Sequence, residues 1–239
     1  MLLTNDIHPS WSSFISSHIE KIKEIESQIG NDFYPNAENV LRFAKNDLAN
    51  VKCIIVGMDP YPQSYVADGI VYPEATGRSF EVGSMKEWTQ KIKQASLRNI
   101  LKTLYYNATG QMVTMEEVRE RIKEGEFIIP KPHEWFDMTE QQGVLWLNST
   151  FTVKPEVPGS HIKIWEEFFK DLCEYIQENN SDITWVLWGN NAARFTQTIK
   201  KGKVIKGVHP RIASFVKENV FEKIKEVKWV QAQNTNKVV

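Results

Sequence analysis

Polar side chains that can do chemistry stand at the ends of four short apolar segments. The segments are residues 51–57, 143–148, 183–189 and 203–208, and the polar residues at their ends include Asp59, Asn148, Asn190 and His209. The carboxyl ends of parallel strands share one edge of a sheet, and ligands bind there. We therefore expect the Asp59 carboxylate, the Asn148 amide and the His209 imidazole to converge. Such a set suits hydrogen-bonded recognition and acid–base chemistry.

Each of these residues alone is more often structural. Asp59 precedes a proline and could simply form a turn, Asn148 could cap a turn, and His209 could be an ordinary loop histidine. All three at equivalent strand ends favour a shared site. One carboxylate and one imidazole do not suit a metal, and no glycine-rich phosphate motif or G-x-S-x-G elbow occurs. We expect no cofactor and no metal site.

The order of the elements predicts an α/β fold. The four apolar segments are short and rich in β-branched residues, which is typical of strands buried on both faces. Helical apolar spacing predicts helices at residues 10–28, 37–48, 84–107, 115–123, 160–178, 191–200 and 214–226. Alternating strands and helices indicate a parallel sheet with right-handed crossovers. Residues 58–83 lack a clear period, and a loop of that length is usually functional or mobile.

Composition bounds the class of protein. With 239 residues, 41% hydrophobic and 25% charged, one domain is expected. No apolar run is long enough to span a membrane, and MLLTNDIHPSWSSF lacks the pattern of a secretory signal. Cys53 and Cys173 are too few for a disulfide framework, so we expect buried thiols in the cytoplasm. The net charge of −1 neither indicates nor excludes nucleic acid. Four lysines lie close together in the chain, and from their charge alone we expect a solvated loop: Lys200, Lys201, Lys203 and Lys206.

A series of ordered motifs resembles family-1 uracil-DNA glycosylases. They are YPNAENVLRFAKNDLANVKCIIVG (34–57), GMDPYP (57–62), SLRNILK (96–102), GVLWLNSTFTV (143–153), SHIKIWEEF (160–168), WVLWGNNAARF (185–195) and GVHP (207–210). The match is collinear over residues 34–215. It implies a single glycosylase-like domain over residues 1–239, a three-layer sandwich with a central four-stranded parallel sheet flanked by helices. It also implies a DNA-repair enzyme that flips uracil out of DNA and hydrolyses its N-glycosidic bond, leaving an abasic site.

The resemblance implies a role for each residue of the site. Asp59 would orient the attacking water and offset positive charge on the sugar. His209, kept neutral, would donate to O2 of the leaving uracil. Tyr61 would exclude the methyl group of thymine, and Asn148 would pair with the uracil edge and reject cytosine. Met58 belongs to the same uracil pocket, although the family usually has glutamine there.

The aromatic residue that stacks on the base has two candidates. The segment ADGIVY (67–72) has the usual distance from Asp59 and offers Tyr72, whereas ATGRSFEV (75–82) matches the residue types better and offers Phe80. We favour Phe80. Either ring could instead be part of the core.

The expected DNA contacts carry most of the departures from the family. These contacts are Ser96, Gly189, Asn190, Pro210, Arg211, Ile212 and Ala213. Ser96 could instead cap a helix, and Gly189 and Asn190 could form a simple turn. Ala213 aligns with the usual leucine wedge and is too small to fill an emptied base stack, so Ile212 or Arg211 would replace it. Pro62 replaces a histidine, and MKEWTQKIKQA replaces the proline-rich loop before Ser96.

Two other functions stay open at this point. One is a DNA-binding or replication-accessory protein that keeps the fold but has weak activity, and the other is a glycosylase for another deaminated base. The partners that the resemblance implies are uracil-containing DNA, single- or double-stranded, and a proteinaceous uracil-glycosylase inhibitor. It implies a monomer without membrane contact.

Overall fold

The computed structural model describes residues 2–231, which form two compact units. The first contains residues up to Ser84 and Gly143–Lys206, and the second contains Met85–Gln142 and the residues from Gly207 onward. The predicted single glycosylase-like domain over residues 1–239 stays a prediction.

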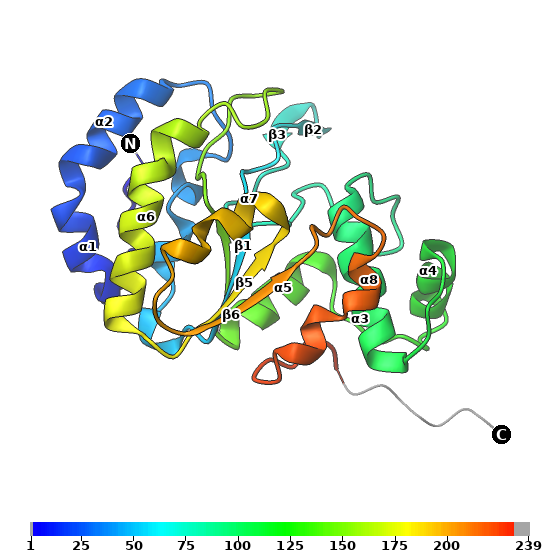
Figure 1. Cartoon of the computed structure of the whole chain (residues 1–239). Helices are drawn as coiled ribbons and strands as arrows, with labels where there is room; N and C mark the ends of the chain where they lie inside the picture. Colours follow the sequence, from blue (N-terminus) through cyan, green and yellow to red (C-terminus); the bar gives the residue numbers. More distant parts are fainter. Residues whose placement is uncertain (1, 232–239) are drawn as a thin grey trace. The chain divides into compact units, whose positions relative to one another are not determined.

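A four-stranded parallel sheet lies at the centre of the first unit (Figure 1). Its strands are β1 (Cys53–Gly57), β4 (Val144–Asn148), β5 (Thr184–Trp188) and β6 (Lys203–Gly207), in the order β4-β1-β5-β6. β1 is paired in parallel with β4 and with β5. Every residue of β1, β4 and β5 is buried, as the apolar segments predict. The predicted sheet is therefore confirmed.

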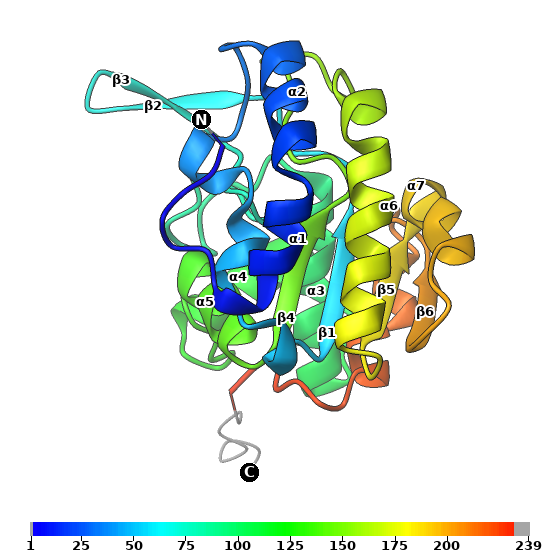
Figure 2. The ribbon, with the colours of Figure 1, turned by 90° about the vertical axis from the view of Figure 1, so that its left-hand side faces the viewer.

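Helices cover one face of this sheet. They are α1 (Ser12–Ser17), α2 (Ile19–Ile29) and α6 (Ile162–Asn179), which Figure 2 shows on the same side of the strands. Alternate strand residues such as Ile54 and Leu145 share a core with Trp11 and Phe168 from these helices. α7 (Gly189–Ala193) and the 3-10 helix η5 (Arg194–Gln197) follow β5 and replace the single helix predicted at 191–200.

Two helix predictions in the N-terminal part were wrong in detail. Residues 10–28 form the 3-10 helix η1 (Pro9–Trp11), then α1 and α2, with a break at His18. Residues 37–48 form no α-helix but the 3-10 turns η2 (Ala37–Asn39), η3 (Arg42–Lys45) and η4 (Leu48–Asn50). The Asp47 side chain accepts from the amide of Ala49 at 3.0 Å. Such local side-chain bonds favour turns over a continuous helix.

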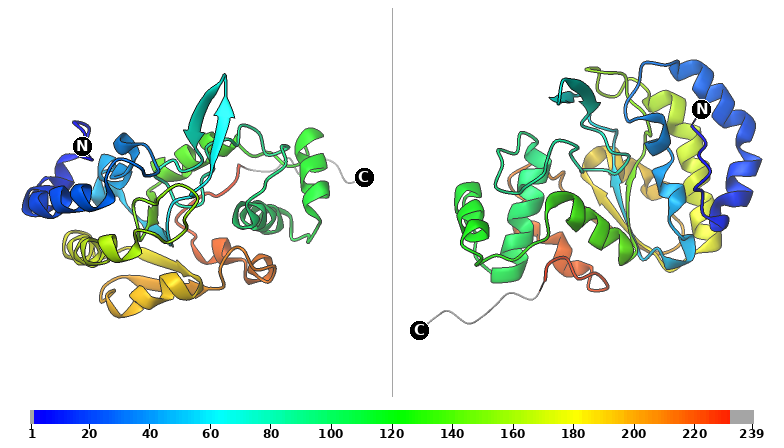
Figure 3. Two further views of the ribbon diagram at one scale, coloured as in Figure 1. Left: turned by 90° about the horizontal axis from the view of Figure 1, so that it is seen from above. Right: turned by 180° about the vertical axis from the view of Figure 1, so that it is seen from behind.

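An unpredicted hairpin occupies much of the segment 58–83. β2 (Ser64–Ala67) and β3 (Ile70–Pro73) pair antiparallel around an Asp68-Gly69 turn. Both turn residues have positive φ, 51° and 76°. Asp-Gly is a recognised signal for a two-residue hairpin turn, but the residues on either side of it do not alternate between apolar and polar. The hairpin extends from the rest of its unit (Figures 2 and 3).

The second unit is helical in its described residues. It contains α3 (Ala95–Thr109), α4 (Met115–Lys123), α5 (Pro132–Gln141), α8 (Phe215–Glu218) and the 3-10 helix η6 (Val220–Lys223). α4 has the predicted bounds and a complete capping box between Thr114 and Glu117. α3 begins later than the predicted residue 84, α5 was not predicted, and the predicted helix 214–226 is two short turns. Trp135 donates to the carbonyl of Trp229 at 2.7 Å and anchors the last described segment.

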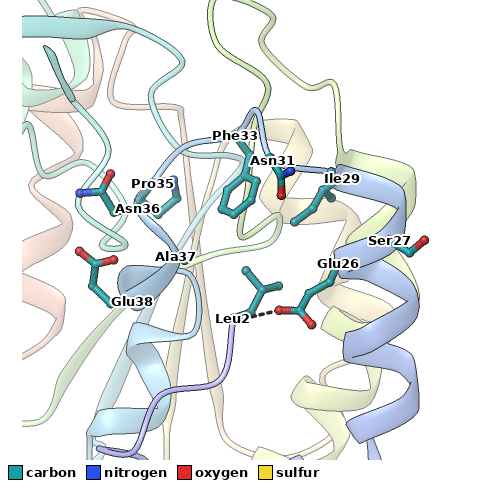
Figure 4. A pocket seen from close by; sticks show the side chains of 11 residues that line it. Leu2, Glu26, Ser27, Ile29, Asn31, Phe33, Pro35, Asn36, Ala37 and Glu38 are labelled. Atoms are coloured by element: carbon teal, nitrogen blue, oxygen red, sulfur yellow. Dashed lines mark hydrogen bonds between the residues drawn. The ribbon is translucent and has the colours of Figure 1, made fainter.

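A pocket of about 740 Å³ lies in the first unit beside α2. Its lining includes Leu2, Glu26, Phe33 and Asn36, and Figure 4 shows the Leu2 amide pointing at the Glu26 carboxylate. The residues that line it include none of the predicted site residues. Across residues 2–231, no helix is both long enough and apolar enough to cross a bilayer.

Candidate active site

The ends of β1 and β4 bring Asp59 close to Asn148 in the first unit. Gly57 is in register with Asn148, and the chains stay joined beyond the sheet. The amide of Ser149 donates to the Gly57 carbonyl at 2.9 Å, and that of Thr150 donates to the Met58 carbonyl at 3.0 Å. The Asn148 side chain is buried at this edge. Two of the predicted site residues, Asp59 and Asn148, therefore follow neighbouring strand ends at the same edge of the sheet.

Glycine at position 57 makes this approach possible. A Cβ there would lie 2.4 Å from Asn148 Oδ1 and 2.7 Å from the Cβ of Ser79. Any larger residue would push the amide of Asn148 out of place. Gly57 thus controls the position of the side chain expected to select the base.

The Asp59 carboxylate is partly buried and accepts a backbone hydrogen bond. The amide of Gly159 donates to Oδ2 at 2.7 Å. Burial raises the pKa of Asp59 above its usual value, while hydrogen bonds from backbone amides oppose that rise. A carboxylate held by one amide, with its second oxygen Oδ1 not engaged in that bond, can orient a water molecule.

Tyr61 and Met58 lie on either side of Asp59 in the chain. Burial, then the negative charges of Glu74 and Asp59, raise the pKa of Tyr61, so its phenol stays neutral at physiological pH. Met58 Sδ lies 2.7 Å from Nδ2 of Asn191 in α7, so the ends of β1 and β5 are in contact as well.

Phe80 is buried against the edge of the sheet in an unusual backbone conformation. Its φ is +65°, a backbone angle that residues other than glycine rarely adopt. Its ring lies edge-on to Trp146 of β4 at 6.4 Å and to Trp188 of β5 at 5.4 Å. The amide of the preceding residue, Ser79, donates to the Trp146 carbonyl at 3.1 Å. Strain that the surrounding structure maintains in this way is common at functional sites.

Tyr72, the other candidate for stacking, lies on β3. It is 36% exposed, and its ring stacks on Tyr65 of β2 at 5.7 Å. Of the two candidates, Tyr72 therefore lies on the hairpin and Phe80 lies against the strands of the sheet.

Gly189 and Asn190 begin α7 directly after β5. Gly189 has φ +81°, so the chain turns there in a conformation that suits glycine. Asn190 is exposed. The other expected DNA contacts, Ser96 and residues 210–213, belong to the second unit.

His209 in the second unit has a defined tautomer. The amide of Arg211 donates to its Nδ1 at 3.1 Å. Because that nitrogen accepts, the neutral ring carries its hydrogen on Nε2 and is a donor there. Burial and the positive charge of Arg211 lower the pKa of His209, which favours the neutral form.

Two side chains hold the backbone on either side of His209. Asn99 of α3 donates from Nδ2 to the carbonyl of Pro210 at 2.6 Å and to that of Ile212 at 3.3 Å. Glu218 at the end of α8 accepts from the amide of Val208 at 3.0 Å. The second unit thus fixes the histidine loop, residues 208–212, from both directions.

The remaining expected DNA contacts belong to the second unit and differ in exposure. Ser96 lies in the first turn of α3, where Gln94 is the N-cap residue, so Ser96 is not the cap. Pro210 is buried, whereas Arg211 and Ala213 are exposed. Ile212 is 49% exposed and is the apolar side chain available at this loop.

Sequence reasoning did not identify Gly159, Asn99 or Glu218 as parts of the site. The Gly159 contact uses a backbone amide, which almost every residue has, so the residue type does not predict it. Asn99 lies inside the SLRNILK motif, but the motif did not predict that its side chain binds the carbonyls of Pro210 and Ile212. Glu218 is 10 residues beyond the amide that it binds.

Comparison with known proteins places the chain among enzymes of one kind. No family model matches it. Uracil-DNA glycosylase of Mesomycoplasma hyopneumoniae is 30% identical over 204 residues, which cover 81% of this chain and 77% of that protein. Uracil-DNA glycosylase of Amoebophilus asiaticus is 28% identical over 216 residues, 86% of this chain and 84% of that protein.

Solved structures agree with the curated relatives. The crystal structure of mimivirus uracil-DNA glycosylase matches with a TM-score of 0.67 and 26% identity over 87% of this chain and 70% of that one. A variant of mimivirus UNG in complex with UGI matches with a TM-score of 0.65, at 26% identity, over 87% of this chain and 71% of that one. With a relative at 30% identity over most of both chains, and with the same fold, this chain belongs to the uracil-DNA glycosylase family of N-glycosyl hydrolases.

Proposed function

We propose that this chain flips uracil out of DNA and hydrolyses its N-glycosidic bond with Asp59 and His209 as the catalytic residues. The products are free uracil and an abasic site. The observation that carries this proposal is the register of β1 and β4, which puts Asp59 and the buried Asn148 at one edge of the sheet. An enzyme that reads a base and attacks the sugar beside it needs these two functions together.

Asn148 selects the base in this proposal. Its amide offers a donor and an acceptor together, which match O4 and N3–H of uracil, whereas cytosine presents the reverse pattern. Phe80 stacks on the flipped base, and Met58 lines the same pocket. Tyr61 occupies the space that the methyl group of thymine would need, and its neutral phenol adds no charge beside the base.

Asp59 acts on the sugar. As the glycosidic bond breaks, the sugar gains positive charge, which a nearby carboxylate stabilises. The same carboxylate orients the water that adds to the sugar carbon, and the proton that this water releases balances the charge of the departing uracil anion. The amide of Gly159 fixes Oδ2, so the water is assigned to Oδ1. Asp59 has to be ionised for both tasks.

His209 acts on the leaving group. The electron pair of the glycosidic bond moves onto uracil, whose O2 accepts a hydrogen bond from Nε2 of the neutral imidazole. The Arg211 amide on Nδ1 supports this tautomer, and the lowered pKa of His209 supports its neutral state. A neutral donor is sufficient because the uracil anion is itself stabilised, and it avoids the cost of a buried positive charge.

Ser96, Gly189, Asn190 and residues 210–213 contact the DNA backbone and the emptied stack in this proposal. Ile212 is the large apolar residue of that group, and its side chain is exposed. A proteinaceous uracil-glycosylase inhibitor is a partner by analogy with the mimivirus UNG structure solved with UGI. A cytoplasmic location, where the buried thiols of Cys53 and Cys173 stay reduced, completes the proposal.

Release of free base from synthetic oligonucleotides tests the function. The full chain is incubated with single- and double-stranded oligonucleotides that contain one uracil, one cytosine or one thymine at the same position. We expect release from the uracil oligonucleotides alone, and loss of that release in Asp59→Asn. DNA binding without base release would instead support the accessory role, and faster release of another deaminated base would reassign the substrate.

A further inference from the structure

The β2–β3 hairpin presents an apolar tip to solvent. Val66 is 70% exposed, Val71 61% and Ile70 55%. Val66 and Val71 are opposite each other in register, so they share one face of the ribbon, while Ile70 lies on the other. Exposed apolar side chains that lie together, unlike single scattered ones, often mark an interaction surface.

The base of the hairpin is fixed to its unit. Buried Glu74 follows β3, and its amide donates to the carbonyl of Gln63 at 2.9 Å. The Glu74 carboxylate accepts from the amide of Ser84 at 2.9 Å and from its hydroxyl at 2.7 Å. On the other side, the amide of Glu156 donates to the Pro62 carbonyl at 2.9 Å. The apolar tip therefore projects from a fixed support.

The hairpin is continuous in the chain with the proposed base pocket. It begins three residues after Tyr61 and ends seven residues before Phe80, and both belong to the same unit. Strands of four residues extend about 13 Å at ~3.3 Å per residue. The hairpin therefore lies in the chain between two residues of the proposed pocket.

The composition of the hairpin suits contact with bases and not with phosphate groups. Residues 62–73 contain no lysine or arginine, and Asp68 is their one charged residue. That composition does not fit phosphate groups, but apolar side chains enter base steps and hold them open. The position of the usual wedge after His209 is occupied by Ala213, whose side chain is too small for this task.

We propose that Val66, Ile70 and Val71 form an apolar wedge that enters the base stack of duplex DNA beside the flipped uracil. This rests on the proposed function. The wedge acts only where a stack has to be opened, so it serves double-stranded substrates and is dispensable on single strands. It adds to whatever contact Ile212 makes.

The test is a double variant, Val66→Thr/Val71→Thr. Threonine has the shape of valine and favours strands, so the hairpin is retained, while the face that Val66 and Val71 share becomes more polar and Ile70 is unchanged. Met112→Gln, outside the hairpin, removes a side chain that is 51% exposed and is the matched control. For each protein, kcat/KM for uracil release is measured on a single strand and on the duplex made from it. A 2-aminopurine next to a non-cleavable uracil analogue reports opening of the stack independently of activity.

We expect kcat/KM of the double variant to fall about tenfold or more on the duplex and less than about twofold on the single strand. The 2-aminopurine signal that reports opening of the stack should be lost. The Met112→Gln control should keep the wild-type kcat/KM on both substrates and the 2-aminopurine signal. Equal loss on both substrates would overturn the wedge, because the hairpin would then only support the pocket. Unchanged duplex activity would overturn it as well. A wild type that releases no uracil from either substrate would instead refute the proposed function.

Discussion

The side-chain amide of Asn99 donates a 2.6 Å hydrogen bond to the carbonyl of Pro210, the residue that follows His209. The same amide reaches the carbonyl of Ile212 at 3.3 Å. One helix residue thus makes two of the contacts that hold the loop carrying His209, the proposed hydrogen-bond donor. In both contacts a side-chain amide donates to a backbone carbonyl, so this part of the loop depends on the chemistry of one amide.

Asn99→Asp should impair catalysis more than binding. The substitution keeps the shape but replaces the donor by a carboxylate facing two carbonyl oxygens, so the histidine loop should move. We expect kcat for uracil release to fall about tenfold or more, with a smaller change in KM. Asn107→Asp on the same helix is the matched control, since Asn107 donates to the side chain of Asn219 at 3.2 Å. If both variants merely melt earlier with kcat unchanged, the Asn99 contact is only structural.

Phe80→Ala should reduce uracil release far more than Tyr72→Ala. Stacking on a base contributes roughly 1–3 kcal/mol by alanine substitution. Phe80→Leu keeps the buried apolar volume and removes the aromatic face, so it separates stacking from packing. The comparison uses a single-stranded substrate at equal folded fraction. Greater loss in Tyr72→Ala would mean that the hairpin, not the sheet edge, supplies the stacking ring.

Asn148→Asp should weaken the choice of uracil over cytosine. The carboxylate loses the donor that reads O4 and gains an acceptor toward the amino group of cytosine. A contact of this kind is typically worth ~1–3 kcal/mol of discrimination. The ratio of kcat/KM for uracil and cytosine oligonucleotides measures the effect. An unchanged ratio would show that this amide does not face the base.

Asp59→Asn should be inactive but at least as stable as the wild type at neutral pH. Burial raises the pKa of Asp59 in the folded protein, so proton binding there favours folding. The resulting destabilisation appears as pH rises through that pKa and is fully present at neutral pH. Asparagine cannot ionise, so melting temperatures of the two proteins should differ at neutral pH and converge in acid. A lower melting temperature for the variant at neutral pH would contradict the direction of this shift.

The sequence predicted the sheet and the residues at its edge because both depend on local patterns. Wholly apolar β-branched segments have few alternatives to buried parallel strands, and their ends place Asp59 and Asn148 without further information. Residues 37–48 were mistaken for a helix because apolar spacing outweighed the turn-forming side chain of Asp47. The hairpin was missed although its Asp68-Gly69 turn was visible, because no alternating pattern surrounds it.

Other features lay beyond sequence reasoning for a physical reason. The tautomer of His209 depends on the amide of Arg211, and the fixed oxygen of Asp59 depends on the amide of Gly159. Every residue but proline has such an amide, so residue types do not report which one is used. The sequence motif already favoured Phe80 over Tyr72, but the contacts of its ring with Trp146 and Trp188 come only from the folded chain.

The pH dependence of His209→Gln against the wild type tests the central claim, that a neutral His209 donates to the departing uracil. Protonation of Nδ1 would set its hydrogen against the amide of Arg211 and break the contact that holds the ring. Because the pKa of His209 is lowered, wild-type activity should hold at neutral pH and fall only below the usual histidine range. Asp59 has to be ionised as well, so two protons should govern the acid limb of the wild type.

Glutamine keeps an amide donor and cannot ionise, so it removes one of these two titrations. The account predicts that kcat/KM of the wild type falls in acid with a slope approaching two on logarithmic axes. His209→Gln should be slower at every pH and should fall with a slope of one, from Asp59 alone. Identical acid limbs in the two proteins would contradict the account, because His209 would then not be the group that has to stay neutral.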